Sequence, residues 1–440
     1  MPGKMHSTLG EIAWNSLSEK DRMKWSLCGQ WPSFAPDFIK KLPPPENAAG
    51  KMSVYCHFLD LMDNCDREYP EFLLPGNKPA PHGAADHNLN SCMTSSWNSD
   101  QQSSRIVLRT FIERASAEIK KQNMEKAALY AGLLAHVLQD AAALGHIFPN
   151  SMFYDFSPEE RNVHINYHTM IDFCEPDLSE ITPDILGAGQ EELVFGLAML
   201  VEKNIRYGKR IFFELLKACR ENDLDSMNKL TAPMLQSSIY QTASLWRSLL
   251  YVNTASGLES KSYSLAEAVP YNCHPGGNYR HLTLNKNIDG NCRFIPLKLD
   301  FGNGPRNVDN SIGLSSFFSA RYLLEPNAFR YFQGYVGLSC ECLDDQYQEM
   351  DVEFFIGLDE NYNRNISGNL DYGESMKKVY SIRLKPGRAA EKFTVELANA
   401  ETLLFGAVCR PVAVNGKKKY CFPHIVLANP ELVNQVDRDE

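Results

Sequence analysis

Five metal-competent residues recur at helical spacing in the middle of the chain, in the order His136-x3-Asp140-x5-His146-x21-His168-x3-Asp172. His136/Asp140 and His168/Asp172 are each four residues apart, which places both side chains of a pair on one face of a helix. Imidazole nitrogens and carboxylate oxygens are the ligands that zinc and similar ions take. A single pair of this kind is more often a solvated or capped histidine. Two pairs with a histidine between them predict a metal site built on helices.

The first part of the chain has the periodicity of helices. Apolar residues recur at helical spacing over residues 8–17, 104–122, 124–144, 191–221 and 226–252. We therefore predict an all-α domain over residues 1–255.

The sequence pattern changes after Thr254, where turn-forming residues such as Pro275-Gly276-Gly277-Asn278 become frequent. Short alternating segments follow, at residues 292–299, 329–337, 351–357, 378–384, 392–397 and 403–408. This density of strands and turns is typical of an all-β sandwich of the jelly-roll kind. The predicted fold class is therefore α + β with two domains: a helical domain, a linker over residues 254–262 and a β-sandwich over residues 263–440.

Charge limits the classes of partner. The 440 residues carry a net charge of −10, which argues against a broad basic face that wraps nucleic acid. It does not exclude a nuclease, because bound cations reverse the field locally.

Neither a signal peptide nor a membrane span is visible in the sequence. Residues 1–17 lack an apolar core of signal-peptide length, and the longest apolar stretch, residues 127–144, contains His136, Gln139 and Asp140. The twelve cysteines form no CxxC pair, so most are expected to be reduced. We expect a protein that is cytoplasmic or exported by a leaderless route, acts at membranes and has no transmembrane segment.

Further candidate ligands lie upstream, at His6, at Asp37 and at His57, which opens the segment His57-Phe58-Leu59-Asp60. An early histidine, an aspartate, a His-Phe-x-Asp segment, His-x3-Asp-x5-His and His-x3-Asp occur in this order in one superfamily. The helical part of the chain therefore resembles the zinc-dependent phospholipases C and single-strand-specific nucleases.

That resemblance implies a cluster of two or three zinc ions. One ion would be held by Asp37, His57 and His136. A second would be held by His6 together with the N-terminal amine and carbonyl, although the family begins with Trp where this chain has Met1. Asp140 would bridge the two ions.

The third ion implied by the resemblance would be held by His146, His168 and Asp172. The catalytic residues would be Asp140, as the bridging ligand, and Asp37, which would orient or deprotonate the attacking water.

The C-terminal domain resembles a type of carbohydrate-binding module found beside glycosidases. The likeness rests on Ser-Ile-Gly-Leu-Ser-Ser at residues 311–316 and on Phe-Arg-Tyr-Phe-Gln-Gly-Tyr-Val-Gly-Leu at residues 329–338. It implies a jelly roll that binds a glycan or a lipid. A sandwich that only stabilises the helical domain is the alternative.

Three functions fit these features. The leading one is a zinc-dependent phospholipase C that uses a metal-activated water to hydrolyse the glycerol-side phosphodiester of membrane phospholipids such as phosphatidylcholine. The alternative is a zinc-dependent single-strand nuclease/3′-nucleotidase, because Asp172 and the 21-residue gap before His168 resemble the nuclease branch. Less favoured is a non-catalytic lipid- or glycan-binding protein.

Overall fold

The fold was analysed in a computed structural model. It describes residues 3–62, 72, 103–142, 171–176, 181–255, 257–270, 272–275, 282–288, 293–315, 318–340, 351–360, 376–410, 412–414, 417–419 and 424–436. Its contacts divide the chain into two compact units, and the change from the first to the second falls after Glu259.

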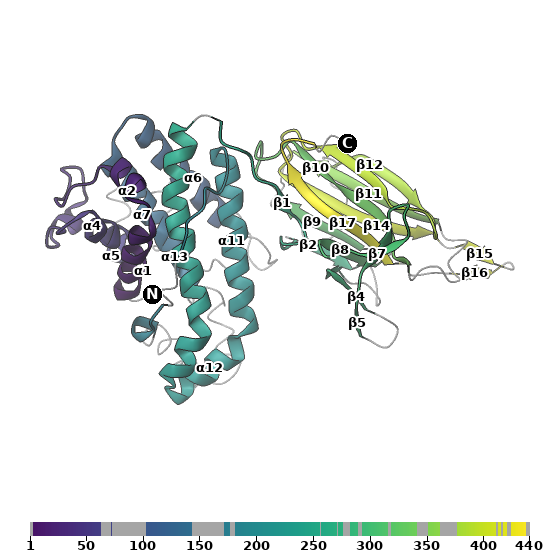
Figure 1. The fold of residues 1–440 in the computed structure, drawn as a ribbon, viewed down its shortest axis with the longest axis horizontal. Helices are drawn as coiled ribbons and strands as arrows, with labels where there is room; N and C mark the ends of the chain where they lie inside the picture. The colour runs from purple at the N-terminus through teal and green to yellow at the C-terminus, as the bar shows by residue number, and fades with distance from the viewer. Residues whose placement is uncertain are drawn as a thin grey trace. The chain divides into compact units, whose positions relative to one another are not determined.

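The first unit is helical and the second is built of strands, so the predicted fold class is confirmed (Figure 1). The described helices are α1 (Gly3–Ser16), α2 (Glu19–Trp25), α3 (Asp37–Lys40), α4 (Ala48–Cys56), α5 (Phe58–Met62), α6 (Ser103–Lys120), α7 (Met124–Asp140), the 3-10 turn η4 (Ile171–Phe173), α11 (Gln190–Arg210), α12 (Phe212–Glu221) and α13 (Leu224–Thr254). None of them is both long and apolar enough to cross a membrane.

Helix α7 is the central helix of the first unit. Residues 127–140 are all buried, because the helix is apolar on every side and packs against α4, α6 and α13. Asn123 caps its start by accepting a hydrogen bond from the Lys126 N–H. The helix ends at Asp140, four residues before the predicted end at residue 144. His136 and Asp140 therefore occupy the last turn of a buried helix.

Two glycines let the neighbouring helices approach closely. A Cβ on Gly132 of α7 would lie 2.3 Å from the Cβ of Tyr55 in α4, and one on Gly10 of α1 would lie 2.7 Å from the Sγ of Cys56. Helix α4 is therefore held in close contact with both α1 and α7. Helix α1 begins at Gly3, before its predicted start at residue 8, so His6 lies in its first turns.

Elsewhere the predicted helices are close to the observed ones. Helix α6 matches the predicted segment 104–122 within two residues at each end. The predicted helix 191–221 is divided at Ile211, where φ −96° and ψ 6° end α11 and α12 begins.

The second unit is a sandwich of two antiparallel sheets. The larger sheet has the order β13-β10-β17-β8-β3, with β1 also paired to β17, and the smaller has the order β12-β11-β14-β9-β2. The larger sheet is built from β1 (Tyr263–Ser264), β3 (Leu282–Leu284), β8 (Ser311–Ser315), β10 (Tyr331–Leu338), β13 (Glu391–Glu396) and β17 (His424–Val433). The smaller is built from β2 (Asn272–Pro275), β9 (Phe318–Leu323), β11 (Asp351–Asp359), β12 (Lys377–Leu384) and β14 (Thr402–Arg410).

Short two-stranded ladders accompany these sheets. They are β4 (Lys286–Ile288) with β5 (Phe294–Pro296), β6 (Lys298–Asp300) with β7 (Pro305–Asn307), and β15 (Val412–Val414) with β16 (Lys417–Lys419). Leu297 and Leu299 from this region pack on Val426 and Ala428, on the face of β17 opposite to Ile425 and Leu427.

Aromatic rings fill the space between the two sheets. Phe332 of β10 stacks on Phe405 of β14 with ring centroids 6.4 Å apart, and Phe393 of β13 lies 6.3 Å from Phe354 of β11. These contacts join strands of different sheets and form the core expected for a sandwich.

Strand β17 lies inside the larger sheet, although the alternation in sequence does not predict it. It contains Asn429 in the left-handed region and Pro430, which has no N–H to donate. The register with β10 shifts there, between Gln333 and Tyr335. A bulge therefore interrupts the period-2 pattern and accommodates the proline.

An ion-pair network on the smaller sheet gives a pH prediction. The carboxylate of Glu353 accepts hydrogen bonds from Lys378 Nζ and Ser381 Oγ, both at 2.8 Å, and the Lys378 bond is the main reason that the pKa of Glu353 is lowered. A lowered carboxyl pKa adds stability that is present above the ordinary value and is lost as the pH falls through the folded value. Glu353→Gln should therefore lower the free energy of unfolding of the sandwich at pH 7 by about 1 kcal/mol or less, seen as a lower melting temperature. The effect should be smaller at pH 3. An equal loss at both pH values would contradict this role.

Candidate metal centre

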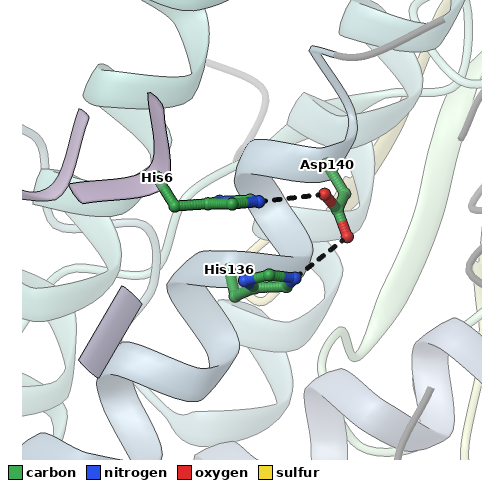
Figure 2. Close-up of side chains that lie close together, drawn as sticks. All are labelled: His6, His136 and Asp140. Atoms are coloured by element: carbon green, nitrogen blue, oxygen red, sulfur yellow. Dashed lines mark ion pairs between the residues drawn. The ribbon is translucent and has the colours of Figure 1, made fainter. Parts of the chain in front are cut away.

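His136 and Asp140 lie one turn apart at the end of α7, with their side chains turned toward each other (Figure 2). The Nε2 atom of His136 is 3.4 Å from Asp140 Oδ2, and both residues are buried. The i,i+4 spacing that predicted a shared helix face is therefore realised for this pair.

The end of α4 orients His136. Its Nδ1 lies 2.8 Å from the backbone carbonyl oxygen of Cys56, the last residue of α4. Carbonyls at a helix end lack intrahelical partners, and a carbonyl can only accept a hydrogen bond. Nδ1 therefore carries the proton, and in the neutral ring Nε2 presents its lone pair toward Asp140. This is the arrangement that metal-binding histidines adopt.

Helix α1 brings His6 to the other oxygen of the same carboxylate. His6 Nε2 lies 3.4 Å from Asp140 Oδ1, and its ring stacks on that of His136 with centroids 3.9 Å apart and planes 19° apart. Its Nδ1 lies 2.8 Å from Gln139 Oε1. Gln139 therefore accepts a hydrogen bond from the Nδ1–H of His6 and orients its ring, as the Cys56 carbonyl does for His136. Both imidazoles therefore direct their Nε2 atoms toward the carboxylate of Asp140.

His6, His136 and Asp140 form the one group of potential metal ligands among the described residues, with donor atoms all within 4.8 Å of one another. Zinc bonds of 2.0–2.1 Å in a tetrahedron place neighbouring ligand atoms about 3.3 Å apart. The two nitrogen-to-oxygen distances of 3.4 Å agree with this separation. The donor set therefore fits zinc, and His6, His136 and Asp140 are the residues that would hold it.

Asp172 lies beside the first turn of α1. Its Oδ1 accepts a hydrogen bond of 3.0 Å from the Met5 N–H in the first turn of α1, one residue before His6. Burial raises the pKa of Asp172, while the bond from Met5 acts in the opposite direction. Asp172, which the sequence assigns to the third ion, therefore lies next to the helix that carries His6. It is 167 positions away from Met5 in the chain.

Asp37 and His57 are not members of this three-residue group. Asp37 begins α3, its side chain is 81% exposed, and its Oδ1 lies 3.4 Å from Lys40 Nζ. His57 is half-buried and is the C-cap residue of α4, directly after Cys56. His146 and His168 lie outside the described residues. The ligand roles of these four residues stay predictions.

Gln139 contacts this group of residues, and the motif does not predict it. Its side chain is fully buried, and its Nε2 donates to Thr242 Oγ1 at 3.5 Å while its Oε1 accepts from His6. The sequence does contain a signal for this role: an amide side chain in an apolar helix, directly before Asp140. A buried amide needs hydrogen-bond partners, so such a residue is expected to contact other polar groups. The Cys56 carbonyl gives no such signal, because a backbone group has the same chemistry at every position.

Replacing Gln139 by leucine should weaken zinc binding by roughly 10–100-fold, the usual effect of losing the group that orients a ligating histidine. Leucine removes the acceptor of the His6 Nδ1–H and leaves this donor buried without a partner. Zinc affinity would be measured by competition with a chelating dye. Thr242→Val is the matched control, since it removes only the 3.5 Å contact of the amide and should have a smaller effect. An unchanged affinity in Gln139→Leu would contradict the role of Gln139.

The chain was also compared with known proteins. It matches no protein-family model and no curated protein sequence. Solved structures that it resembles include the alpha-toxins of Clostridium perfringens, from an avian strain (11% identity, TM-score 0.33, covering 97% of this chain and 96% of the toxin), and of Clostridium absonum (12%, 0.30, 98% and 94%). A CBM51 module from a Clostridium perfringens GH95 protein, solved with methyl-galactose, covers 39% of this chain and 100% of the module, with 17% identity and a TM-score of 0.29.

The toxins are matched over nearly the whole chain and the carbohydrate-binding module over part of it. At these identities and TM-scores, the similarity transfers no activity, metal or ligand to this chain.

Proposed function

We propose that the helical domain, residues 1–255, is a zinc-dependent phosphodiester hydrolase, and specifically a phospholipase C. The observation that carries this proposal is the buried group of His6, His136 and Asp140, in which both Nε2 atoms face the oxygens of one carboxylate. Each Nδ1 has its own acceptor, Gln139 or Cys56, so the ligand geometry is set before any ion binds.

Zinc, when bound, supplies Lewis-acid polarisation of a phosphoryl oxygen and lowers the pKa of water toward about 7. The residues of the chain supply the charge, the ligand orientation and the exclusion of bulk water. Asp140 supplies negative charge at the end of α7, and the two histidines are held in one tautomer. Burial of all three residues keeps bulk water away and strengthens their electrostatic interactions. A net charge of −10 would repel a phosphate diester, so local positive charge is needed at the site.

Lipid is the favoured substrate because of the second domain. A β-sandwich joined to a small hydrolytic domain suits a substrate that is presented at a surface, and we propose that residues 263–440 bind lipid or glycan there. This role rests on the motifs at residues 311–316 and 329–338.

A single-strand nuclease is the second candidate. Phe173, next to Asp172, is 61% exposed, and Lys4 Nζ lies 5.8 Å from the centre of its ring. An exposed aromatic ring beside a cation could stack on a nucleobase while the ammonium contacts phosphate. Phe173→Ala should then reduce cleavage of DNA more than cleavage of lipid.

The test is a substrate panel with the zinc-loaded full chain. Phosphatidylcholine vesicles, phosphatidylglycerol vesicles and single-stranded DNA would be supplied separately, with chelator-treated protein as the control. The proposal expects zinc-dependent release of diacylglycerol and of the phosphorylated headgroup. Release of nucleotides without any cleavage of lipid would show that the activity is that of a nuclease and not of a phospholipase C. Inactivity toward every diester would contradict the proposal of a hydrolase.

A further inference from the structure

A second cluster of reactive side chains lies where α4 meets the start of α7. Lys51 of α4 has a fully buried side chain, and its Nζ lies 2.8 Å from both carboxylate oxygens of Glu125, in the first turn of α7. A buried lysine needs such a partner, since an isolated ammonium is costly to bury. The Glu125 side chain is 20% exposed, so it lies between the buried Lys51 side chain and the surface.

Cys28, in the segment after α2, covers this ion pair. Its N–H donates to Glu125 Oε1 at 3.1 Å, and its Sγ lies 3.3 Å from the same oxygen and 3.8 Å from Lys51 Nζ. Cys28 is exposed, whereas Cys56, Cys174, Cys219 and Cys409 are buried. A small oxidant in solution therefore reaches the Cys28 thiol directly, with a buried amine immediately behind it.

The hydroxyl of Tyr55 belongs to the same region. Tyr55 is fully buried, and its oxygen makes no hydrogen bond within the described part of the chain. Burial, and then the charges of Glu125 and Cys28, raise the pKa of Tyr55, so the hydroxyl stays protonated beside them. A polar product formed on the thiol would offer this buried donor an acceptor.

We propose that Cys28 and Lys51 are a site of oxidative modification, at which a peroxide converts the two side chains into a covalent sulfur–nitrogen crosslink. In the first step the thiol reacts with hydrogen peroxide, R–SH + H2O2 → R–SOH + H2O, so that sulfur is oxidised and the O–O bond breaks. In the second step the amine of Lys51 attacks this sulfur, R–SOH + R′–NH2 → R–S–NH–R′ + H2O.

Each residue of the cluster has a part in these steps. Glu125 takes the proton that converts the Lys51 ammonium to the attacking amine, because both of its oxygens already lie at hydrogen-bonding distance from Nζ. The 3.8 Å between Nζ and Sγ is close to van der Waals contact, so the bond needs only a side-chain movement. The burial of Lys51 keeps its amine from other electrophiles, and the sulfenic acid therefore meets this nucleophile first.

The experiment is peroxide treatment of the full-length protein, followed by intact mass spectrometry and peptide mapping without reduction. The expected product is about 2 Da lighter, as an S–N bond requires the loss of two hydrogens, and it contains one peptide pair joined through Cys28 and Lys51. A thiol reductant should reverse the change. Cys28→Ser should abolish the crosslink.

Lys51→Arg is the matched variant for the amine, because it keeps a cation beside Glu125 but removes the nucleophile. In this variant Cys28 should accumulate as the sulfenic acid, detected with a cyclic-dione probe. Three results would overturn the proposal: an unchanged mass, a wild-type protein that accumulates the sulfenic acid without a crosslink, or a loss of 2 Da that peptide mapping assigns to a disulfide. All three readouts are independent of zinc and of hydrolytic activity.

Discussion

Asp140→Ala should lower the zinc affinity of the helical domain by more than about 100-fold and abolish diester hydrolysis, because loss of a group that merely orients a ligand already costs roughly 10–100-fold. Asp140 is the residue that both histidines face, Oδ1 at 3.4 Å from His6 and Oδ2 at 3.4 Å from His136. Alanine removes both oxygens and leaves the two stacked imidazoles without the carboxylate that their Nε2 atoms face. The measurements are zinc per chain after dialysis and the rate on the best substrate of the panel.

Glu221→Ala is a control for the removal of an acid from the same domain. Glu221 ends α12, its side chain is 57% exposed, and its Oε1 lies 4.0 Å from Lys217 Nζ. This variant should keep its zinc and its rate. Near-normal zinc content and turnover in Asp140→Ala would refute the shared-ligand role of Asp140.

Gly132→Ala should destabilise the helical domain by about 1–3 kcal/mol or more, the usual range for overpacking a closely packed core. The new Cβ would lie 2.3 Å from Tyr55 Cβ and 2.8 Å from the Tyr55 carbonyl carbon, so α4 and α7 must separate. The next residue, Cys56, provides the carbonyl that orients His136. Zinc affinity should therefore fall together with stability.

Gly50→Ala gives a control of the same chemical kind within α4. A Cβ there would have its nearest neighbours at 3.7 Å, which is ordinary contact, and the Gly50 N–H bond to Asn47 Oδ1 is kept. Since alanine favours a helix over glycine by about 0.5–1 kcal/mol, this variant should be as stable as the wild type or more so. Thermal unfolding and zinc titration of both variants test the pair. A Gly132→Ala protein of unchanged stability and affinity would show that close packing of α4 on α7 does not support the site.

The sequence predicts well where local periodicity is strong. Helices α6, α7 and α13 and strands β10, β11 and β12 lie within a few residues of the predicted segments. His136 and Asp140 share a helix face as their spacing predicts, because four residues complete about one helical turn.

Contacts between distant segments are where sequence reasoning fails. The pairing of His6 with Gln139 spans 133 positions, and that of His136 with the Cys56 carbonyl spans 80. Neither follows from spacing, since both depend on how closely α1 and α4 pack on α7. Gly10 and Gly132 permit that packing, and a glycine within a helix does not reveal in sequence which helix approaches it.

In the proposed site, the chain holds zinc through imidazole nitrogens and carboxylate oxygens at the end of α7. Zinc-edge X-ray absorption of the metal-loaded full-length protein tests it most directly. The structure predicts a first shell of nitrogen and oxygen at about 2.0–2.1 Å with the outer-shell scattering of imidazole. A sulfur shell at about 2.3 Å, or a shell without imidazole, would contradict it.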